Sequence, residues 1–118
     1  MEHITIKVND YITLNKGLTP EEGEIILQLL LKAFSNGDKV LLDFSGVEIM
    51  TTAFLNVAIG NLYSDYSSDQ LKELLSFNDD LPDSVAQKIK LVTDAAKSFY
   101  NDEEQFSNII DKVLNEND

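Results

Sequence analysis

The segment that most constrains the fold of this chain runs from Lys39 to Tyr63 and reads KVLLDFSGVEIMTTAFLNVAIGNLY. It opens on a nearly continuous apolar run, Val40–Phe44, which is typical of a strand covered on both faces in a parallel sheet. Ser45 and Gly46 interrupt this run, and a helical pattern follows from Thr51. The segment therefore predicts a buried central strand, a short loop and a helix packed against the sheet.

The predicted helix has two different sides. Its apolar residues recur every four positions in two adjacent columns, which would form one broad face against the sheet. These residues are Phe54, Ala58, Leu62 and Tyr66 in one column and Leu55, Ile59 and Tyr63 in the other. The remaining side consists of small or weakly polar residues: Ala53, Asn56, Val57, Gly60, Asn61 and Ser64. Because a solvent-facing helix side usually carries Lys and Glu, we interpret this uncharged side as a contact surface.

The segments on either side of this unit also carry secondary-structure patterns. The alternation in His3–Val8 predicts a half-buried strand, and Tyr11–Leu14 is expected to return as the second arm of a hairpin. Thr19–Glu22 has the residues of a capping box with Pro at the first helical position, and the helix should end at Asn36–Gly37. A further strand is predicted over Leu71–Phe77.

The C-terminal part of the chain is expected to be helical. Pro82 opens a helix with apolar residues at three- and four-residue steps, and Asn101-Asp102 is expected to interrupt it before an extra helix at about 103–114. The resulting order of hairpin, α, β, α, β, α, α predicts an α/β class with a small mixed, mostly parallel sheet. We expect a single domain over residues 1–118 with its core in residues 3–100.

The composition narrows the range of partners and locations. Nine basic residues against 21 acidic ones give a net charge of −12, which argues against nucleic acid and against an anionic membrane surface. Cysteine is absent, so disulfides and thiolate chemistry are excluded. No segment resembles a signal peptide, and no apolar run approaches the roughly 18 residues of a membrane span. We therefore expect a cytoplasmic protein.

Few residues suggest catalysis or metal binding. The loop SGVEIMTT is neither a dinucleotide fingerprint nor a phosphate-binding loop, and the single histidine, His3, lies in a terminal strand. The acidic groups Asp79–Asp83 and Asp102–Glu104 stand at predicted helix starts, where carboxylates cap free amides. Asp43 is interpreted as an acceptor for the following loop. We therefore predict no catalytic residue, no metal and no cofactor.

Thr51 and Thr52 at the start of the central helix permit two interpretations. A threonine at this position ordinarily caps the helix, and its loss costs on the order of 1 kcal/mol. Hydroxyl groups at a helix start are also a natural place for a phosphate, because the free amides there favour negative charge. Physical chemistry favours the cap but leaves both readings open.

The segment VLLDFSGVEIMTTAFLNVAIGNLY resembles the core signature of the STAS-like domains of unknown function, which are related to bacterial STAS domains such as the anti-sigma-factor antagonists. Further similarity lies in Thr19–Gly23 and Ile89–Tyr100. The resemblance implies helices mainly on one face of the sheet and a non-enzymatic role in signalling. In the antagonists, a kinase phosphorylates a serine at the start of the second helix. The corresponding position here is Thr52, preceded by Thr51 where the family usually has Asp.

The leading interpretation is thus a regulatory module that binds a protein partner, such as an anti-sigma-factor-like kinase, and is switched by phosphorylation of Thr52 or Thr51. The predicted partner-binding residues are Ser45, Gly46, Thr51, Thr52, Asn56, Val57, Gly60 and Asn61. The alternative is a sensor that binds a small molecule or nucleotide at the same strand–loop–helix site. A pocket beside Asp43 and Thr51 would favour the sensor, and an uncharged exposed patch around Val57 would favour the interaction module.

Overall fold

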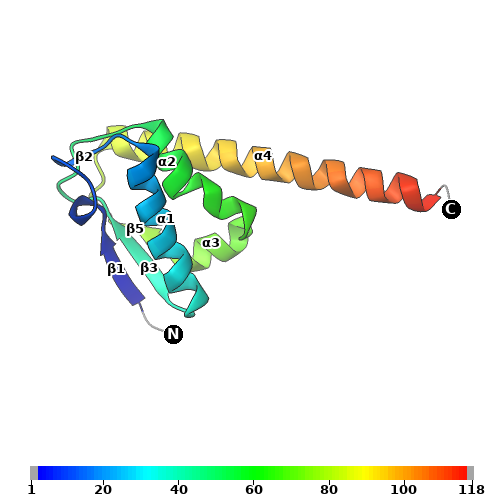
Figure 1. The fold of residues 1–118 in the computed structure, drawn as a ribbon, viewed down its shortest axis with the longest axis horizontal. Coiled ribbons are helices and arrows are strands. Elements are labelled where there is room, and N and C mark those ends of the chain that lie inside the picture. Colours follow the sequence, from blue (N-terminus) through cyan, green and yellow to red (C-terminus); the bar gives the residue numbers. More distant parts are fainter. Residues whose placement is uncertain (1–2, 117–118) are drawn as a thin grey trace.

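A computed structural model describes the backbone of residues 3–116 and the side chains of residues 3–100. The elements are, in chain order, β1 (His3–Lys7), the 3-10 helix η1 (Val8–Asp10), β2 (Lys16–Gly17), α1 (Pro20–Ser35), β3 (Lys39–Asp43), β4 (Ile49–Met50), α2 (Thr52–Ala58), the 3-10 helix η2 (Gly60–Ser64), α3 (Ser68–Leu74), β5 (Leu75–Phe77) and α4 (Asp83–Glu116). Figure 1 shows α1 and α2 side by side, with α4 extending beyond the rest of the molecule.

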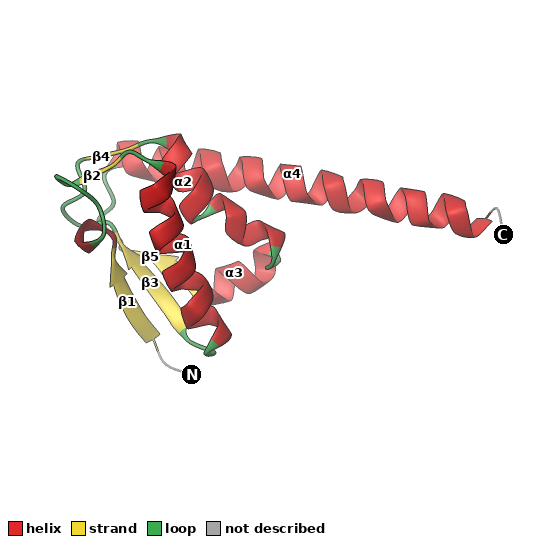
Figure 2. Cartoon of the chain, in the orientation of Figure 1, coloured by secondary structure: helices red, strands yellow, loops and turns green. Residues whose placement is uncertain are grey.

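The strands form two small parallel sheets. The larger has the order β1-β3-β5, so the predicted central strand is central. The smaller is a ribbon in which Lys16 and Gly17 of β2 pair with Ile49 and Met50 of β4. Figure 2 shows this ribbon beyond the carboxyl ends of the three longer strands. The predicted α/β class with a small, mostly parallel sheet is confirmed.

Burial alternates along β3. Val40 and Leu42 are buried, whereas Leu41 and Asp43 are only half-buried. The prediction of a strand covered on both faces is therefore wrong. Successive side chains of a strand point to opposite faces, and the helices cover one of them. Leu41, the first leucine of the run, lies on the less covered face, so its apolar character does not mean that it is buried.

The N-terminal hairpin is also not formed. β1 pairs in parallel with β3, and the chain then leaves the sheet through η1. Tyr11–Leu14 is no strand: its only bridge is the isolated antiparallel contact of Thr13 with Lys16. Leu14 and Asn15 adopt φ angles of 54° and 60° in the turn before β2. The alternation in the first strand predicted its conformation correctly but gave no information about which strand it would pair with.

The predicted strand over Leu71–Phe77 is helical in its first half. Ser67 caps α3, and its hydroxyl accepts a hydrogen bond from the amide of Gln70 at 3.1 Å. The side chain of Gln70 in turn accepts one from the amide of Ser67 at 2.8 Å. This capping box supports a helix through Leu74, and only the last three residues form β5. They pair in parallel with β3.

α4 is one continuous helix in the structure. The interruption predicted at Asn101-Asp102 is absent, and the helix runs from Asp83 to Glu116. Asn and Asp are less favourable in a helix interior than Ala by only a few tenths of a kcal/mol, which does not suffice to end a helix. The apolar side chains of the predicted last helix lie outside the described residues. No helix within residues 3–116 has the length and hydrophobicity that a membrane crossing requires.

The core is built where α1, α2 and β3 meet. The predicted capping box opens α1: the Thr19 hydroxyl accepts from the amide of Glu22 at 3.2 Å. One turn later Gly23 lets the two helices approach closely. A Cβ atom at this position would lie 2.5 Å from the carbonyl oxygen of Phe54. Phe54 and its neighbour Leu55 are fully buried, as the two apolar columns of the central helix predicted.

Candidate functional site

Thr51 is the N-cap of α2 and is fixed by three hydrogen bonds. Its hydroxyl oxygen accepts from the amide of Phe54 at 3.1 Å, while the hydroxyl proton goes to the carbonyl of Leu18 at 3.0 Å. Its own amide donates to the carbonyl of Gly17 at 2.9 Å. The residue therefore ties the start of α2 to the segment after β2. The bond from Phe54 is the helix cap that the sequence predicted, and the bond to Leu18 is an additional contact that it did not predict.

Thr52 differs from its neighbour in exposure. It occupies the first helical position of α2, and its side chain is exposed, whereas that of Thr51 is half-buried. Of the two candidate hydroxyl groups, Thr52 therefore presents the more accessible one to a modifying enzyme. A phosphate here would add about −1.5 to −2 charges at neutral pH.

Three large apolar side chains are exposed on the β2–β4 ribbon and the residues that flank it, before this helix start. Leu14 is 79% exposed, and Leu18 and Ile49 are each 46% exposed. They come from the turn before β2, the residue after β2, and β4, and we call them the ribbon patch. The amide of Glu48 donates to the carbonyl of Asn15 at 2.8 Å, so the backbone bonds of the ribbon hold these segments together. The bonds from Thr51 to the carbonyls of Gly17 and Leu18 place the Leu18 end of the ribbon patch at the start of α2, and Leu14 lies toward its other end.

The sequence pattern did not reveal the ribbon patch. Its residues are isolated apolar positions among turn residues, and single exposed leucines are common on protein surfaces. Only the parallel pairing of β2 with β4 brings them together. The signal available in the sequence was the presence of Leu14 and Leu18 close to Asn15 and Gly17, residue types that usually mark turns with polar surroundings.

The loop after β3 is held from both sides. The carboxylate of Asp43 accepts from the amide of Ser45 at 2.8 Å, and Asn78 accepts from the amide of Phe44 at 2.9 Å. The hydrogen bonds from Ser45 lower the pKa of Asp43, and the nearby charge of Lys7 lowers it further. The interpretation of Asp43 as a loop acceptor is confirmed. Ser45 is exposed, like the glycine that follows it.

That glycine, Gly46, has a φ angle of +81°, in the region that other residues rarely adopt. It brings the backbone close to Asn9, whose side-chain nitrogen would lie 3.0 Å from a Cβ at this position. The loop therefore keeps a fixed shape on the same end of the sheet as the ribbon. Among residues that the structure describes, no three acidic or histidine side chains gather as metal ligands.

The uncharged side of α2 is not one continuous surface. Asn56 and Asn61 are exposed, but Gly60 is buried beneath Val92 of α4. Val57 is half-buried and packs toward α1, where its Cβ would lie 3.2 Å from a Cβ added at Gly23. The expectation of an exposed patch centred on Val57 is wrong. Small residues on this side allow two other helices of the same chain to pack closely, which explains their lack of charge.

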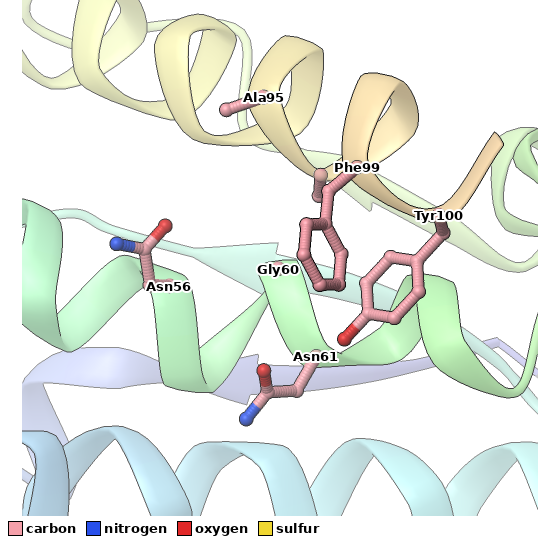
Figure 3. A pocket seen from close by; sticks show the side chains of 7 residues that line it. Asn56, Gly60, Asn61, Ala95, Phe99 and Tyr100 are labelled. Carbon is pink, nitrogen blue, oxygen red and sulfur yellow. The ribbon is translucent and has the colours of Figure 1, made fainter. Parts of the chain in front are cut away.

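What remains open on this side is a groove between α2–η2 and α4, which Figure 3 shows from close by. It has a volume of about 280 Å³ and uncharged walls. Its lining residues are Asn56, Gly60, Asn61, Ala95, Ala96, Phe99 and Tyr100. The groove brings together three of the predicted partner-binding residues with aromatic residues of α4. It lies at the far end of α2 from Thr52.

Asp43 and Thr51 line neither this groove nor two further clefts. One of these lies between α4 and the α3–β5 segment and includes Tyr63 and Thr93, with a volume of about 170 Å³. The other, of about 310 Å³, lies between β1 and α1 and includes Tyr11 and Leu29. None of the three clefts is therefore the pocket beside Asp43 and Thr51 that would favour a small-molecule sensor.

A small parallel sheet with helices on one face, and a strand–loop–helix unit at its centre, define a STAS-like domain. A family model described as STAS-like domain of unknown function (DUF4325) matches residues 22–84, more than half of the chain. The chain belongs to this family, as the sequence resemblance predicted. The matched residues run from the first turn of α1 to the start of α4. No curated protein and no solved structure matches the chain.

Proposed function

We propose that this STAS-like domain is a non-enzymatic regulatory module that binds a protein partner through the ribbon patch and the first turn of α2. The observation that carries the proposal is the position of Thr52, an exposed residue at the start of α2, directly after the ribbon whose residues Leu18 and Ile49 are also exposed. Leu14, Leu18 and Ile49 are not needed by the core, and grouped apolar exposure of this kind marks interaction sites. The partner is expected to present a complementary apolar surface.

The two threonines have different roles, and this difference supports a switch at this surface. Thr51 carries the structural role, so the fold does not depend on the hydroxyl of Thr52. A phosphate on Thr52 would place charge beside the ribbon patch without breaking a described hydrogen bond. Charge at the edge of an apolar contact must be desolvated when the partner binds, which is unfavourable. Phosphorylation is thus expected to release the partner, by analogy with the antagonists that the sequence resembles.

The alternative sensor function has no comparable support. The carboxylate of Asp43 and the hydroxyl of Thr51 are both engaged by the protein itself. Neither residue lines any of the three clefts described above. We therefore retain the interaction module as the proposed function and place no small-molecule site at the strand–loop–helix unit.

The proposal is tested by parallel affinity capture from cells of the source organism. The baits are the parent chain, the ribbon variants Leu18→Asp and Ile49→Asp, and a control, Ile25→Asp. Ile25 is 47% exposed on α1 and matches the ribbon residues in exposure and size. A protein retained by the parent and by the control, but lost with both ribbon variants, is the expected result. Equal retention by all four baits would refute the ribbon patch as the contact surface.

A further inference from the structure

We propose that this chain forms a homodimer in which β1 of one copy pairs antiparallel with β1 of the other, across a twofold axis at Thr5. Two observations carry the proposal: the free edge of β1, and the groove between β1 and α1 that opens beside this edge. None of the residues involved belongs to the ribbon patch, and the proposal does not depend on the proposed function.

β1 is an edge strand. Within residues 3–116 it pairs in the sheet with β3 alone, and Figure 2 shows it as the outermost strand. Its other side presents a row of backbone amides and carbonyls to which a further strand can bind. β1 contains no proline, and its register with β3 has no break, so neither of these devices blocks such pairing. At the opposite edge β5 has only three residues, whereas β1 has five.

The sequence of β1 identifies the occupant of this edge as a second copy of the chain. The strand reads His-Ile-Thr-Ile-Lys, so the same apolar residue stands on both sides of Thr5. In an antiparallel pair centred on Thr5, Ile4 of each copy lies directly opposite Ile6 of the other, and Thr5 lies opposite itself. The Thr–Thr pair stabilises a sheet, and the two Ile pairs bury apolar surface. An isologous contact requires this symmetry, whereas an unrelated partner strand does not.

The ends of the strand favour the antiparallel direction. In the antiparallel register Lys7 lies opposite His3 of the other copy, whereas a parallel pair in register would set Lys7 against Lys7. Like charges directly opposite each other destabilise a sheet. Lys7 also has an opposite charge in its own copy, because it stands beside Asp43 in the register with β3. Besides the hydrogen bonds from Ser45, the charge of Lys7 lowers the pKa of Asp43.

The groove beside β1 gives the second strand room. It has a volume of about 310 Å³, and its lining includes Ile4 and Ile6 of the strand, Leu29 of α1 and Tyr11. α1 packs mainly over β3, so Ile4 at the edge is only half-buried. A second β1 would extend this apolar floor, and Leu29 and Tyr11 of both copies would flank the Ile pairs. With strands about 4.8 Å apart, the two α1 helices would stand roughly 14 Å apart, beyond the 8–10 Å of packed helices, so they would not collide.

The first test is sedimentation equilibrium of the full chain over a concentration series. The parent is expected to dimerise. Thr5 is exposed, and Thr5→Asp sets two carboxylates opposite each other at the twofold axis, so it should weaken dimerisation at least about tenfold. The matched control Ser76→Asp makes a similar change at an exposed position of β5 and should dimerise like the parent. Circular dichroism and thermal unfolding check that both variants fold. A parent that stays monomeric up to high micromolar concentration, or a dimer that Thr5→Asp leaves intact, would overturn the proposal.

A charge-reversal pair tests whether the axis passes through Thr5. Thr5→Lys should also dimerise weakly alone, because two ammonium groups then face each other. A mixture of Thr5→Asp and Thr5→Lys should form a heterodimer, because position 5 of one copy faces position 5 of the other and the charges become opposite. Sedimentation of the mixture measures the recovery. A mixture that dimerises no better than its two components would refute the axis at Thr5.

Cysteine cross-linking determines the direction of the two strands. The chain has no cysteine of its own, so single cysteines can be introduced by His3→Cys and Lys7→Cys. In the antiparallel pair position 3 faces position 7, while the two copies of position 3 are four residues, or about 13 Å, apart along the strands. Neither variant should therefore cross-link with itself under mild oxidation, but their mixture should give a disulfide-linked heterodimer, identified by intact mass. Cross-linking of either variant with itself, or none in the mixture, would refute the antiparallel register.

Discussion

Two regions next to α2 differ in how far their apolar side chains are covered. One is the side of the helix that faces α1, and the other is the ribbon patch that precedes its first turn. At the α1–α2 contact Phe54 is fully buried, and Gly23 leaves no room for even one more carbon atom. At the ribbon patch Leu14, Leu18 and Ile49 stay in contact with water although the same helix begins there. The short helix α2 thus packs into the core on one side, and its start follows a surface that is available to a partner.

The first prediction concerns the covered side and has the largest expected effect. Phe54→Ala should lower the free energy of unfolding by about 3–5 kcal/mol, because it leaves a cavity among α1, α2 and the ribbon. Urea unfolding followed by circular dichroism measures the change. The matched substitution on the exposed side, Leu14→Ala, should change stability by less than about 0.5 kcal/mol. Similar losses of unfolding free energy in the two variants would contradict the difference in burial between the two regions.

Gly23→Ala examines the close approach of the two helices. Alanine favours a helix interior over glycine by about 1 kcal/mol, so an open position would be stabilised. Here the added Cβ would lie 2.5 Å from the carbonyl oxygen of Phe54, and α1 and α2 would have to separate. We expect a net destabilisation of about 1–3 kcal/mol, the usual range for overpacking. A rise in the thermal midpoint would mean that the two helices can move apart freely.

The two threonines sharpen the comparison at the boundary between the regions. Thr51→Val should cost about 1–2 kcal/mol, because it removes the cap of α2 and the bond to Leu18. Thr52→Val should be nearly neutral, because Thr52 is exposed and its hydroxyl is not the cap. Thermal unfolding of the two variants side by side measures the difference. Equal losses would show that Thr52 also has a structural role, which would weaken its assignment as a switch.

The smallest effect concerns the start of α1. Burial raises the pKa of Glu22, but hydrogen bonds from Thr19 and from the amide of Thr13 outweigh it and hold the pKa below the ordinary value of 4.5. A lowered pKa means that the carboxylate stabilises the fold above pH 4.5 and that this contribution disappears as the pH falls through the folded-state pKa. Glu22→Gln should therefore be less stable than the parent at neutral pH, and the difference should shrink in acid. A difference independent of pH would contradict this linkage.

The covered region could be predicted from the sequence to a far greater extent than the exposed one. The columns containing Phe54 and Leu55 and the capping box at Thr19 follow from local spacing, which a single segment contains. The pairing of β1 with β3, and the proximity of Leu18 to Ile49, depend on contacts between segments more than 30 residues apart. Alternation within a strand fixes its inward face but contains no information about its neighbour.

Val57 shows the same limit within a single helix. Its column is uncharged, and an uncharged side is compatible both with a partner surface and with packing against other helices of the chain. In the structure Val57 packs against α1 at Gly23, and Gly60 lies beneath α4, so these two positions serve packing within the chain. Val57→Glu should therefore destabilise the fold, and it is unsuitable as a probe of partner binding. Substitutions in the ribbon patch avoid this difficulty.

The central claim is that Thr52 lies at the edge of the partner surface and controls it by charge. Its most direct test is the dissociation constant of the captured partner for the parent, Thr52→Val and Thr52→Glu, measured by titration calorimetry on variants shown to fold. We predict that Thr52→Val binds like the parent, while Thr52→Glu binds at least about tenfold more weakly, a difference of roughly 1.4 kcal/mol. Equal binding by the parent and Thr52→Glu would contradict the claim.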